Sequence, residues 1–221
     1  MDRRPGPPAS TLAEDLLLLC ASPDAPRLRL PGHFRFVVSG GVLAELLEAG
    51  AATLHGNRLV LVSPDAAPAT LSHAAAAFSR SAAPPRGARL RRCLTLLGRQ
   101  VATPYLESLV RREHLQRGTR KLLGLVPTTR YTATPAGLAA RKALVARIAD
   151  AVDSPAAAPP RSLRLAALAH AGGLTARLYP GPVANRVARR RLADLTRDDP
   201  VATAVRAAVR AARNAESGAA G

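Results

Sequence analysis

The residues of this chain best suited to chemistry are its arginines. Thirty of the 32 basic side chains are Arg, against 15 acidic residues, which gives a formal net charge of +17. A guanidinium group binds phosphate through two parallel hydrogen bonds. The charge is also uneven, because residues 1–85 are formally neutral while residues 86–121 alone carry a net charge of +8. A GC-rich genome also favours Arg and Ala, so the uneven distribution carries more weight than the Arg content. It predicts a polyanionic partner, either nucleic acid or an anionic membrane surface.

No motif indicates catalysis, a cofactor or a bound metal. The GxxxxGK[ST], GxSxG and HExxH patterns are missing from the sequence, and the five histidines stand singly. We expect a lone histidine on a helix, such as His170, to be a packed structural residue. Only two cysteines are present, Cys20 and Cys93, and we expect both to be buried thiols in a reducing cytosol. The sequence therefore predicts a non-enzymatic, cytoplasmic protein without cofactor or metal.

The segment 119–133 predicts a β-hairpin in which β-compatible residues flank a Pro-Thr-Thr turn. Four apolar residues cluster at its turn, namely Leu122, Leu123, Leu125 and Val126. Basic residues flank them: Arg117, Arg120, Lys121 and Arg130. An apolar tip with a basic collar is typical of a membrane-contacting surface. In the alternative interpretation, the leucines pack against the body of the protein or against a second copy in a homo-oligomer.

Nucleic-acid binding is the second hypothesis, and the composition weakens it. Three Phe, three Tyr and no Trp provide few platforms on which single-stranded bases could stack. Contacts with the phosphates of a duplex stay open as the alternative function. Arg206, Arg210 and Arg213 recur at i, i+4 and i+7, opposite a stripe of valines, which indicates the solvated face of an amphipathic helix.

The sequence predicts one mostly α-helical domain over residues 10–214, with two peripheral β-hairpins, and these elements must position the residues named above. We expect a disordered leader at 1–9 and a frayed tail at 215–221. Thr11 and Glu14 predict a capping box that opens a first helix. Gly56-Asn57 predicts the turn of the first hairpin. Further helices are expected over 70–82, 87–99, 103–116, 135–152, 162–179, 183–195 and 200–213.

Several of these segments, in this order, resemble the Golgi phosphoprotein 3 family. They are LAEDLLLL near the start, AELLEAG followed by a hairpin, RQVATPYLESLVRREHL, LLGLVPTTRY and LAALAHAGGL. The resemblance covers nearly the whole folded chain, and the composition fits a bacterial member. It implies a peripheral membrane protein on the cytosolic face that binds the head group of phosphatidylinositol 4-phosphate. Eukaryotic members also hold glycosyltransferase tails at the Golgi, which implies membrane-protein clients.

The resemblance transfers to individual positions only in part. Arg99 falls on the first arginine of the family's paired R-x-x-R head-group pattern, whereas the second falls on Ala102. The family's pocket tryptophan falls near Leu30, and its partner arginine near Ser39. From the residues themselves, we expect three further arginines to add charge to the head-group site with Arg99: Arg92, Arg89 and Arg35. Arg92 precedes Arg99 by seven residues, which places both on one face of a continuous helix.

Overall fold

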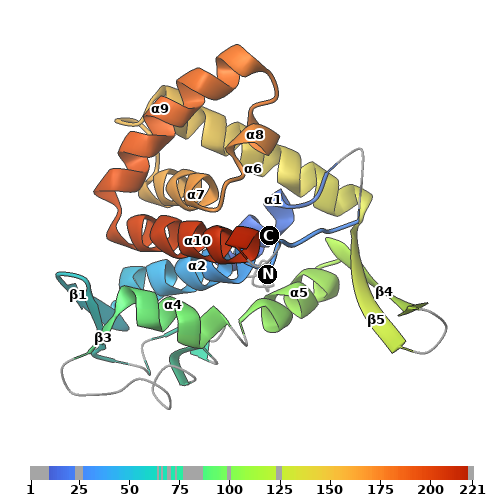
Figure 1. The fold of residues 1–221 in the computed structure, drawn as a ribbon, viewed down its shortest axis with the longest axis horizontal. Helices are drawn as coiled ribbons and strands as arrows, with labels where there is room; N and C mark the ends of the chain where they lie inside the picture. Colours follow the sequence, from blue (N-terminus) through green and yellow to red (C-terminus); the bar gives the residue numbers. More distant parts are fainter. Residues whose placement is uncertain are drawn as a thin grey trace, which may run out of the picture.

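The computed structural model describes residues 10–22, 27–63, 65, 67–68, 71–72, 74–76, 87–98, 101–122 and 126–218, with the backbone alone at 120–122 and 126–128. Its helices are α1 (Leu12–Leu19), α2 (Phe34–Glu48), α4 (Leu90–Gly98), α5 (Ala102–Arg111), α6 (Pro135–Asp153), α7 (Pro160–Ala171), α8 (Thr175–Leu178), α9 (Pro182–Asp198) and α10 (Pro200–Gly218). Its strands are β1 (Ala52–His55), β2 (Arg58–Leu61), β3 (Ala88–Arg89), β4 (Leu115–Leu122) and β5 (Val126–Ala133). The prediction of a mostly α-helical protein with small β-hairpins is confirmed (Figure 1).

Helix α1 lies at the centre of the protein. The capping box is confirmed, because the Thr11 hydroxyl accepts from the Glu14 N–H and the Glu14 carboxylate accepts from the Thr11 N–H. All eight residues of α1 are buried, so it is covered on every side. Its neighbours include α2, α5, α6 and α7. A helix that is apolar on most faces is stable only in such an enclosed position.

Three carboxylates are buried around α1, and three arginines compensate them. Glu14, Asp15 and Glu45 are 1%, 3% and 8% exposed. The arginines that pair with them are Arg112, Arg147 and Arg161, and we call these six residues the α1 ion-pair network. Arg161 is its centre, because its guanidinium lies 2.9 Å from Glu45 Oε1 and 3.4 Å from Asp15 Oδ2 and also donates to the Ser10 carbonyl. Buried carboxylates persist only with such partners.

The first predicted hairpin is confirmed, and a third strand extends it. Strands β1 and β2 pair antiparallel, and His55 faces Arg58 across Gly56-Asn57. Gly56 has φ = 60°, which glycine adopts without steric cost. β3 pairs with β2 where the sequence analysis expected a helix to begin at residue 87; instead, α4 begins at Leu90. The backbone of Ala88 and Arg89 pairs with β2, so these two residues are not part of the helix.

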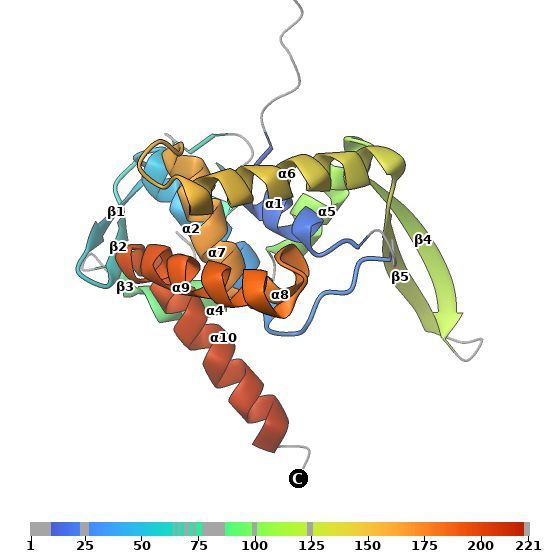
Figure 2. The same cartoon turned by 90° about the horizontal axis from the view of Figure 1, so that it is seen from above.

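The second hairpin is longer than predicted, and its turn lies elsewhere. β4 and β5 pair from Leu115↔Ala133 to Leu122↔Val126, so Pro127-Thr128-Thr129 belongs to β5 and is not a turn. A two-stranded ribbon has a free edge on each strand, so it tolerates a proline that lacks an N–H. The helix expected over 103–116 ends at Arg111 for the same reason, since residues from Leu115 onward pair with β5. Figure 2 shows β4 and β5 extending away from the helices.

The C-terminal helices pack beside one another, with α7 against α6, α9 and α10. The helix expected over 162–179 is interrupted at Gly172-Gly173, after which α8 begins at Thr175. Gly173 has φ = 79°, which ends α7. Helix α10 runs on to Gly218 and so includes the first residues of the tail expected to fray, and its last turns project from the body (Figure 2). The helix expected over 70–82 and the leader 1–9 fall largely or wholly outside the described residues.

Candidate functional site

Arg35, one of the expected head-group arginines, lies beside the end of α4. A Cβ built on Gly98 would lie 3.3 Å from Arg35 Cγ, so the stem of Arg35 packs against the last residue of this helix. The guanidinium carbon lies 4.8 Å from the centre of the Phe36 ring, a cation–π contact. Arg99 is outside the described residues, but Arg35 is next to the residue that precedes it.

The other two arginines follow α4 away from this point. Arg92 is exposed, about 9 Å along the helix from Gly98 at 1.5 Å per residue. Arg89 lies in β3 and faces Arg58 across the sheet. The three described arginines therefore lie near α4, with Arg89 just before its start, Arg92 in its first turn and Arg35 beside its last residue. None of the three described members, Arg35, Arg89 and Arg92, lines the pockets described below.

The positions that fall on the family's lipid-binding pattern have mostly structural environments. Ser39 is fully buried, and its hydroxyl donates to the Arg35 carbonyl at 2.8 Å. Leu30 is half-buried and packs against the core. Ala102 is half-buried at the start of α5. Of these three side chains, none provides a charged group, and that of Ser39 cannot reach solvent.

The hairpin expected to contact a membrane is anchored at its base. The Tyr131 hydroxyl donates to Glu107 Oε1 at 2.9 Å, and Arg117 Nη1 lies 3.4 Å from the same oxygen, so both strands are tied to α5. Leu122 and Val126 pair at the far ends of the strands. Leu123 and Leu125 lie outside the described residues.

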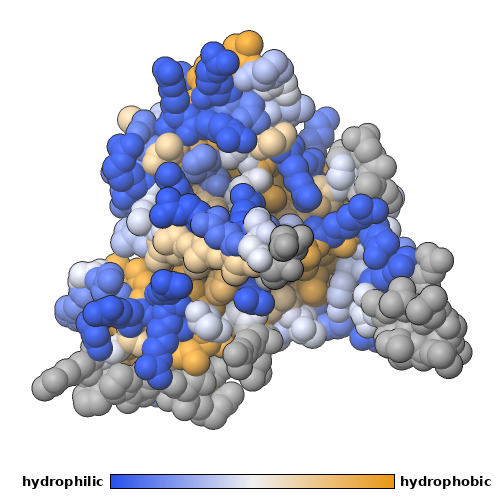
Figure 3. All heavy atoms as spheres, viewed as in Figure 1, coloured by the Kyte–Doolittle hydropathy of each residue, from blue (hydrophilic) through white to orange (hydrophobic). Residues whose placement is uncertain are grey.

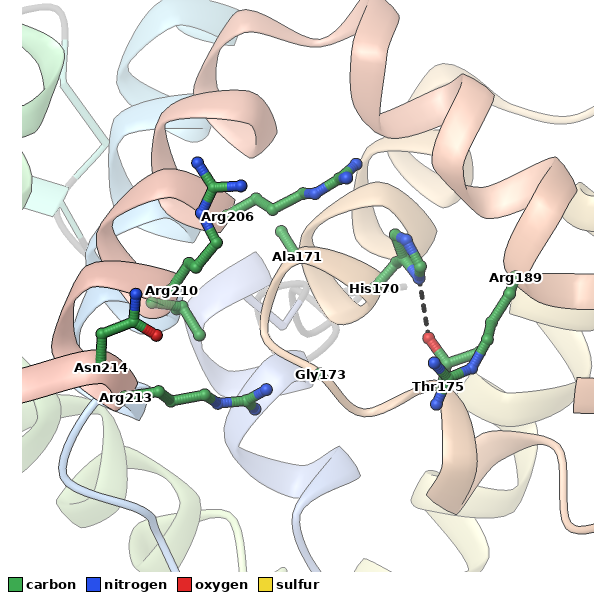
Figure 4. A pocket seen from close by; sticks show the side chains of 10 residues that line it. His170, Ala171, Gly173, Thr175, Arg189, Arg206, Arg210, Arg213 and Asn214 are labelled. Carbon is green, nitrogen blue, oxygen red and sulfur yellow. Dashed lines mark hydrogen bonds between the residues drawn. The ribbon is translucent and has the colours of Figure 1, made fainter. Parts of the chain in front are cut away.

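A pocket of about 400 Å³ opens between the turn that joins α7 to α8 and the helices α9 and α10 (Figure 4). We call it the arginine pocket; it is lined by His170, Ala171, Gly173, Thr175, Arg189, Arg206, Val209, Arg210, Arg213 and Asn214. Arg206 and Arg213 extend from α10 toward α7 and its C-terminal turn, and Arg189 reaches Thr175 from α9 (Figure 4). Four arginines and no carboxylate therefore line this hollow among the described residues.

Two of the four arginines have polar neighbours within the protein. Arg213 Nη2 lies 3.2 Å from His33 Nε2 and 3.5 Å from the Gly172 carbonyl. A Cβ at Gly173 would lie 2.3 Å from Arg213 Nη2, so the Arg213 guanidinium occupies space that a side chain at residue 173 would fill. Arg189 Nε donates to Asn185 Oδ1. Within the described part of the chain, no carboxylate pairs with any of the four.

His170 lies at the inner side of the arginine pocket. Its Nδ1 lies 2.8 Å from the Thr175 hydroxyl, so the expected structural contact is present, but the ring also lines the pocket. Burial lowers the pKa of His170, and the positive charges of Arg206 and Arg189 lower it further. The imidazole is therefore neutral at pH 7, while the positive charges around it remain.

Two other hollows share arginines with the arginine pocket. Arg206 and Arg210 also line a hollow of about 350 Å³ between α9 and α10, and Arg189 lines another of about 500 Å³ near Tyr179. Figure 3 shows hydrophilic side chains gathered over α9 and α10 on this face. The sequence analysis did not identify this site. The sequence pattern that could have indicated the arginine pocket is the spacing of Arg206, Arg210 and Arg213 on one face of α10. This spacing alone does not show that α7 and α9 pack around that face.

The described residues offer no other reactive centre. Burial raises the pKa of both thiols, Cys20 and Cys93, to about 12, so they stay protonated, as expected of packed structural residues. No group of three His, Cys, Asp or Glu side chains within the described ranges could hold a metal ion. Among the same residues, no helix has the length and apolar character needed to cross a membrane.

The fold and the site define a class: a mostly helical, arginine-rich protein with an arginine-lined pocket and a projecting β-hairpin. A model of the Golgi phosphoprotein 3 (GPP34) family matches residues 12–212. The chain therefore belongs to the Golgi phosphoprotein 3 family, as the sequence analysis predicted. A search of curated proteins gives no match.

Proposed function

We propose that this protein is a peripheral membrane protein that binds phosphorylated lipid head groups, of the phosphatidylinositol 4-phosphate type, on the cytosolic face of a membrane. Membership of the Golgi phosphoprotein 3 family supports this function. The observation that carries it at residue level is the contact between Arg35 and Gly98. It puts the stem of the exposed Arg35 side chain against Gly98, the residue that precedes Arg99, which is the position matching the family's first head-group arginine.

The charge and the hairpin support the same function. Arg35, Arg92 and Arg89 add positive charge along α4, and each arginine near an anionic surface contributes about 1 kcal/mol to binding. The ends of β4 and β5 lie away from the helical body, on the side toward which the end of α10 also projects (Figure 2). Leu122, Leu123, Leu125 and Val126 would add insertion energy there, about 1.5–3 kcal/mol for each side chain that is fully buried.

Sedimentation with phosphatidylcholine vesicles, with and without phosphatidylinositol 4-phosphate, tests the proposal. We expect binding only with the phosphoinositide, a loss of about tenfold in affinity for Arg99→Ala or Arg35→Ala, and a larger loss for Leu123→Asp. Arg190→Ala is the matched control, because Arg190 is exposed on α9 and distant in sequence from α4 and the hairpin. Equal sedimentation of all variants would contradict the proposal.

The same vesicles distinguish the remaining roles of the hairpin. If Leu123→Asp abolishes self-association in solution and leaves vesicle binding unchanged, the hairpin joins copies of the chain and does not enter the membrane. Binding to duplex DNA with a steep dependence on salt, in place of vesicle binding, would favour the nucleic-acid alternative. Membrane-protein clients would be expected to require the vesicle-bound form.

A further inference from the structure

We propose that the arginine pocket is a second anion site, which binds a small ligand carrying more than one phosphate group. It is separate from the proposed head-group residues, since none of Arg35, Arg89 and Arg92 lines it. It is built from α7, α8, α9 and α10 alone, so it does not depend on the proposed membrane function.

The charge of the pocket is the first argument. Arg206 and Arg210 have neither a hydrogen-bond acceptor nor a carboxylate partner within the described residues, although other arginines of the protein find carboxylates. Side chains of like charge that converge on one hollow repel one another, and they gain energy when an anion enters. Burial and the charges of Arg206 and Arg189 keep His170 neutral, so it does not add to this repulsion.

The shape of the pocket is the second argument. A hollow of about 400 Å³ lies within the range of small-molecule sites and is too small for a nucleic-acid duplex. Arg206 and Arg213 enter from α10 and Arg189 from α9, so guanidinium groups approach from two sides (Figure 4). Such an arrangement suits the tetrahedral oxygens of phosphate, which accept bidentate hydrogen bonds from arginine in several directions.

The number of arginines indicates more than one phosphate. A single phosphate carries at most about two negative charges near neutral pH, whereas four guanidinium groups line the pocket. Arg206 and Arg210 also face the adjoining hollow of about 350 Å³, which gives room for a second phosphate beside the first. The Thr175 hydroxyl from α8 and the Asn214 amide from α10 are uncharged polar groups that line opposite sides of the pocket and can contact the remainder of the ligand (Figure 4).

Titration calorimetry with inorganic pyrophosphate at low ionic strength tests the site without a membrane. We expect binding by the wild type and a weakening of about tenfold or more for Arg206→Ala and for Arg210→Ala, since each removes a charge-assisted contact. Arg190→Ala removes the same charge from α9 outside the pocket, and we expect it to bind within about twofold of the wild type. Pyrophosphate should raise the melting temperature of the wild type and of Arg190→Ala, but not that of the Arg206→Ala/Arg210→Ala double variant.

A second arm distinguishes a soluble ligand from a lipid. Sedimentation with phosphatidylcholine vesicles containing phosphatidic acid presents the phosphate on a membrane. If Arg206→Ala lowers this binding and Arg190→Ala does not, while pyrophosphate fails to bind, the pocket binds the phosphate of a lipid head group, and the proposal of a small ligand with more than one phosphate is overturned. If Arg206→Ala and Arg190→Ala behave alike in both arms, or the wild type binds neither probe, the inference is overturned. The vesicle experiment on Arg35 and Arg99 has its own outcome, so either proposal can fail alone.

Discussion

Two groups of arginines in this protein have opposite surroundings. In the α1 ion-pair network, Arg161 is two-thirds buried and contacts two carboxylates that are almost inaccessible to solvent. In the arginine pocket, Arg206 and Arg210 are exposed and face other arginines. We infer from this difference in surroundings that an arginine stabilises this fold where a carboxylate lies beside its guanidinium group.

The same comparison separates structural from functional charge. Removing an arginine from the α1 ion-pair network leaves a buried carboxylate without its counter-charge, which is costly. Removing Arg206 or Arg210 from the arginine pocket relieves repulsion, and under our proposal it also removes a contact to the bound anion. Removal of an arginine should therefore lower the stability of the protein in the α1 ion-pair network, whereas in the arginine pocket it should lower anion binding and leave stability unchanged or higher.

The largest effect is expected for Arg161→Ala. Among the described residues, the substitution leaves the Glu45 carboxylate with a hydrogen bond from the Leu12 N–H and leaves Asp15 with Arg147 at 3.5 Å. Because Glu45 and Asp15 are buried, we expect a loss of about 3 kcal/mol in the free energy of unfolding, measured by urea denaturation. A loss below about 1 kcal/mol would mean that the α1 ion-pair network is not structural.

A smaller effect is expected when the pH falls from 7 to 5. The pKa of His170 is lowered in the folded protein by burial and then by Arg206 and Arg189, so the unfolded chain binds a proton at a higher pH than the folded one. Stability is then fully present above about pH 6.5 and declines as the pH falls toward the lowered pKa. His170→Gln should lose less stability than the wild type over this range, in unfolding curves recorded at both pH values.

Bound pyrophosphate should reverse this pH effect. An anion in the arginine pocket offsets the charges of Arg189, Arg206, Arg210 and Arg213, so it favours protonated His170. Although pyrophosphate itself loses negative charge as the pH falls from 7 to 5, the wild type should then retain its binding better than His170→Gln. The measurement is the dissociation constant at the two pH values for the wild type and His170→Gln. If the dissociation constant changes with pH by the same factor in both proteins, His170 does not contribute to anion binding.

The smallest effect is expected from the double variant Arg206→Ala/Arg210→Ala. These residues are four apart on α10, and like charges at this spacing destabilise a helix by about 0.2–0.5 kcal/mol. Alanine also has a helix propensity at least equal to that of arginine. We therefore expect unchanged or slightly increased stability in the absence of ligand. If the double variant loses as much free energy of unfolding as Arg161→Ala, the arginines of the pocket are structural in the same way as those of the α1 ion-pair network.

Local sequence signals predicted the local structure well. The capping box of Thr11 and Glu14 and the turn at Gly56-Asn57 depend on neighbouring residues, and both are present. Predictions failed where distant pairing decided the outcome. Residues 115–116 leave the expected helix to pair with β5, and Pro127 enters a strand because the ribbon offers it a free edge.

The site was predicted less completely for the same reason. Arg35 was named for its charge alone, and its contact with Gly98 comes from the packing of α2 against α4. Arg189 belongs to the arginine pocket through the packing of α9 beside α7, although 17 residues separate it from Arg206 in the sequence.

By itself, the sequence determined the helical class of this protein, its family, its two hairpins and the basic character of its second half. The family follows from the order of its short matching segments, and the other features follow from periodicity, short-range capping and turn chemistry, and total charge. None of these requires knowledge of distant contacts. Only the tertiary structure decided which arginines are paired and which converge on a hollow. A guanidinium is neutralised by whatever carboxylate lies within a few ångströms, and the partners of Arg161 lie 116 and 146 residues away along the chain.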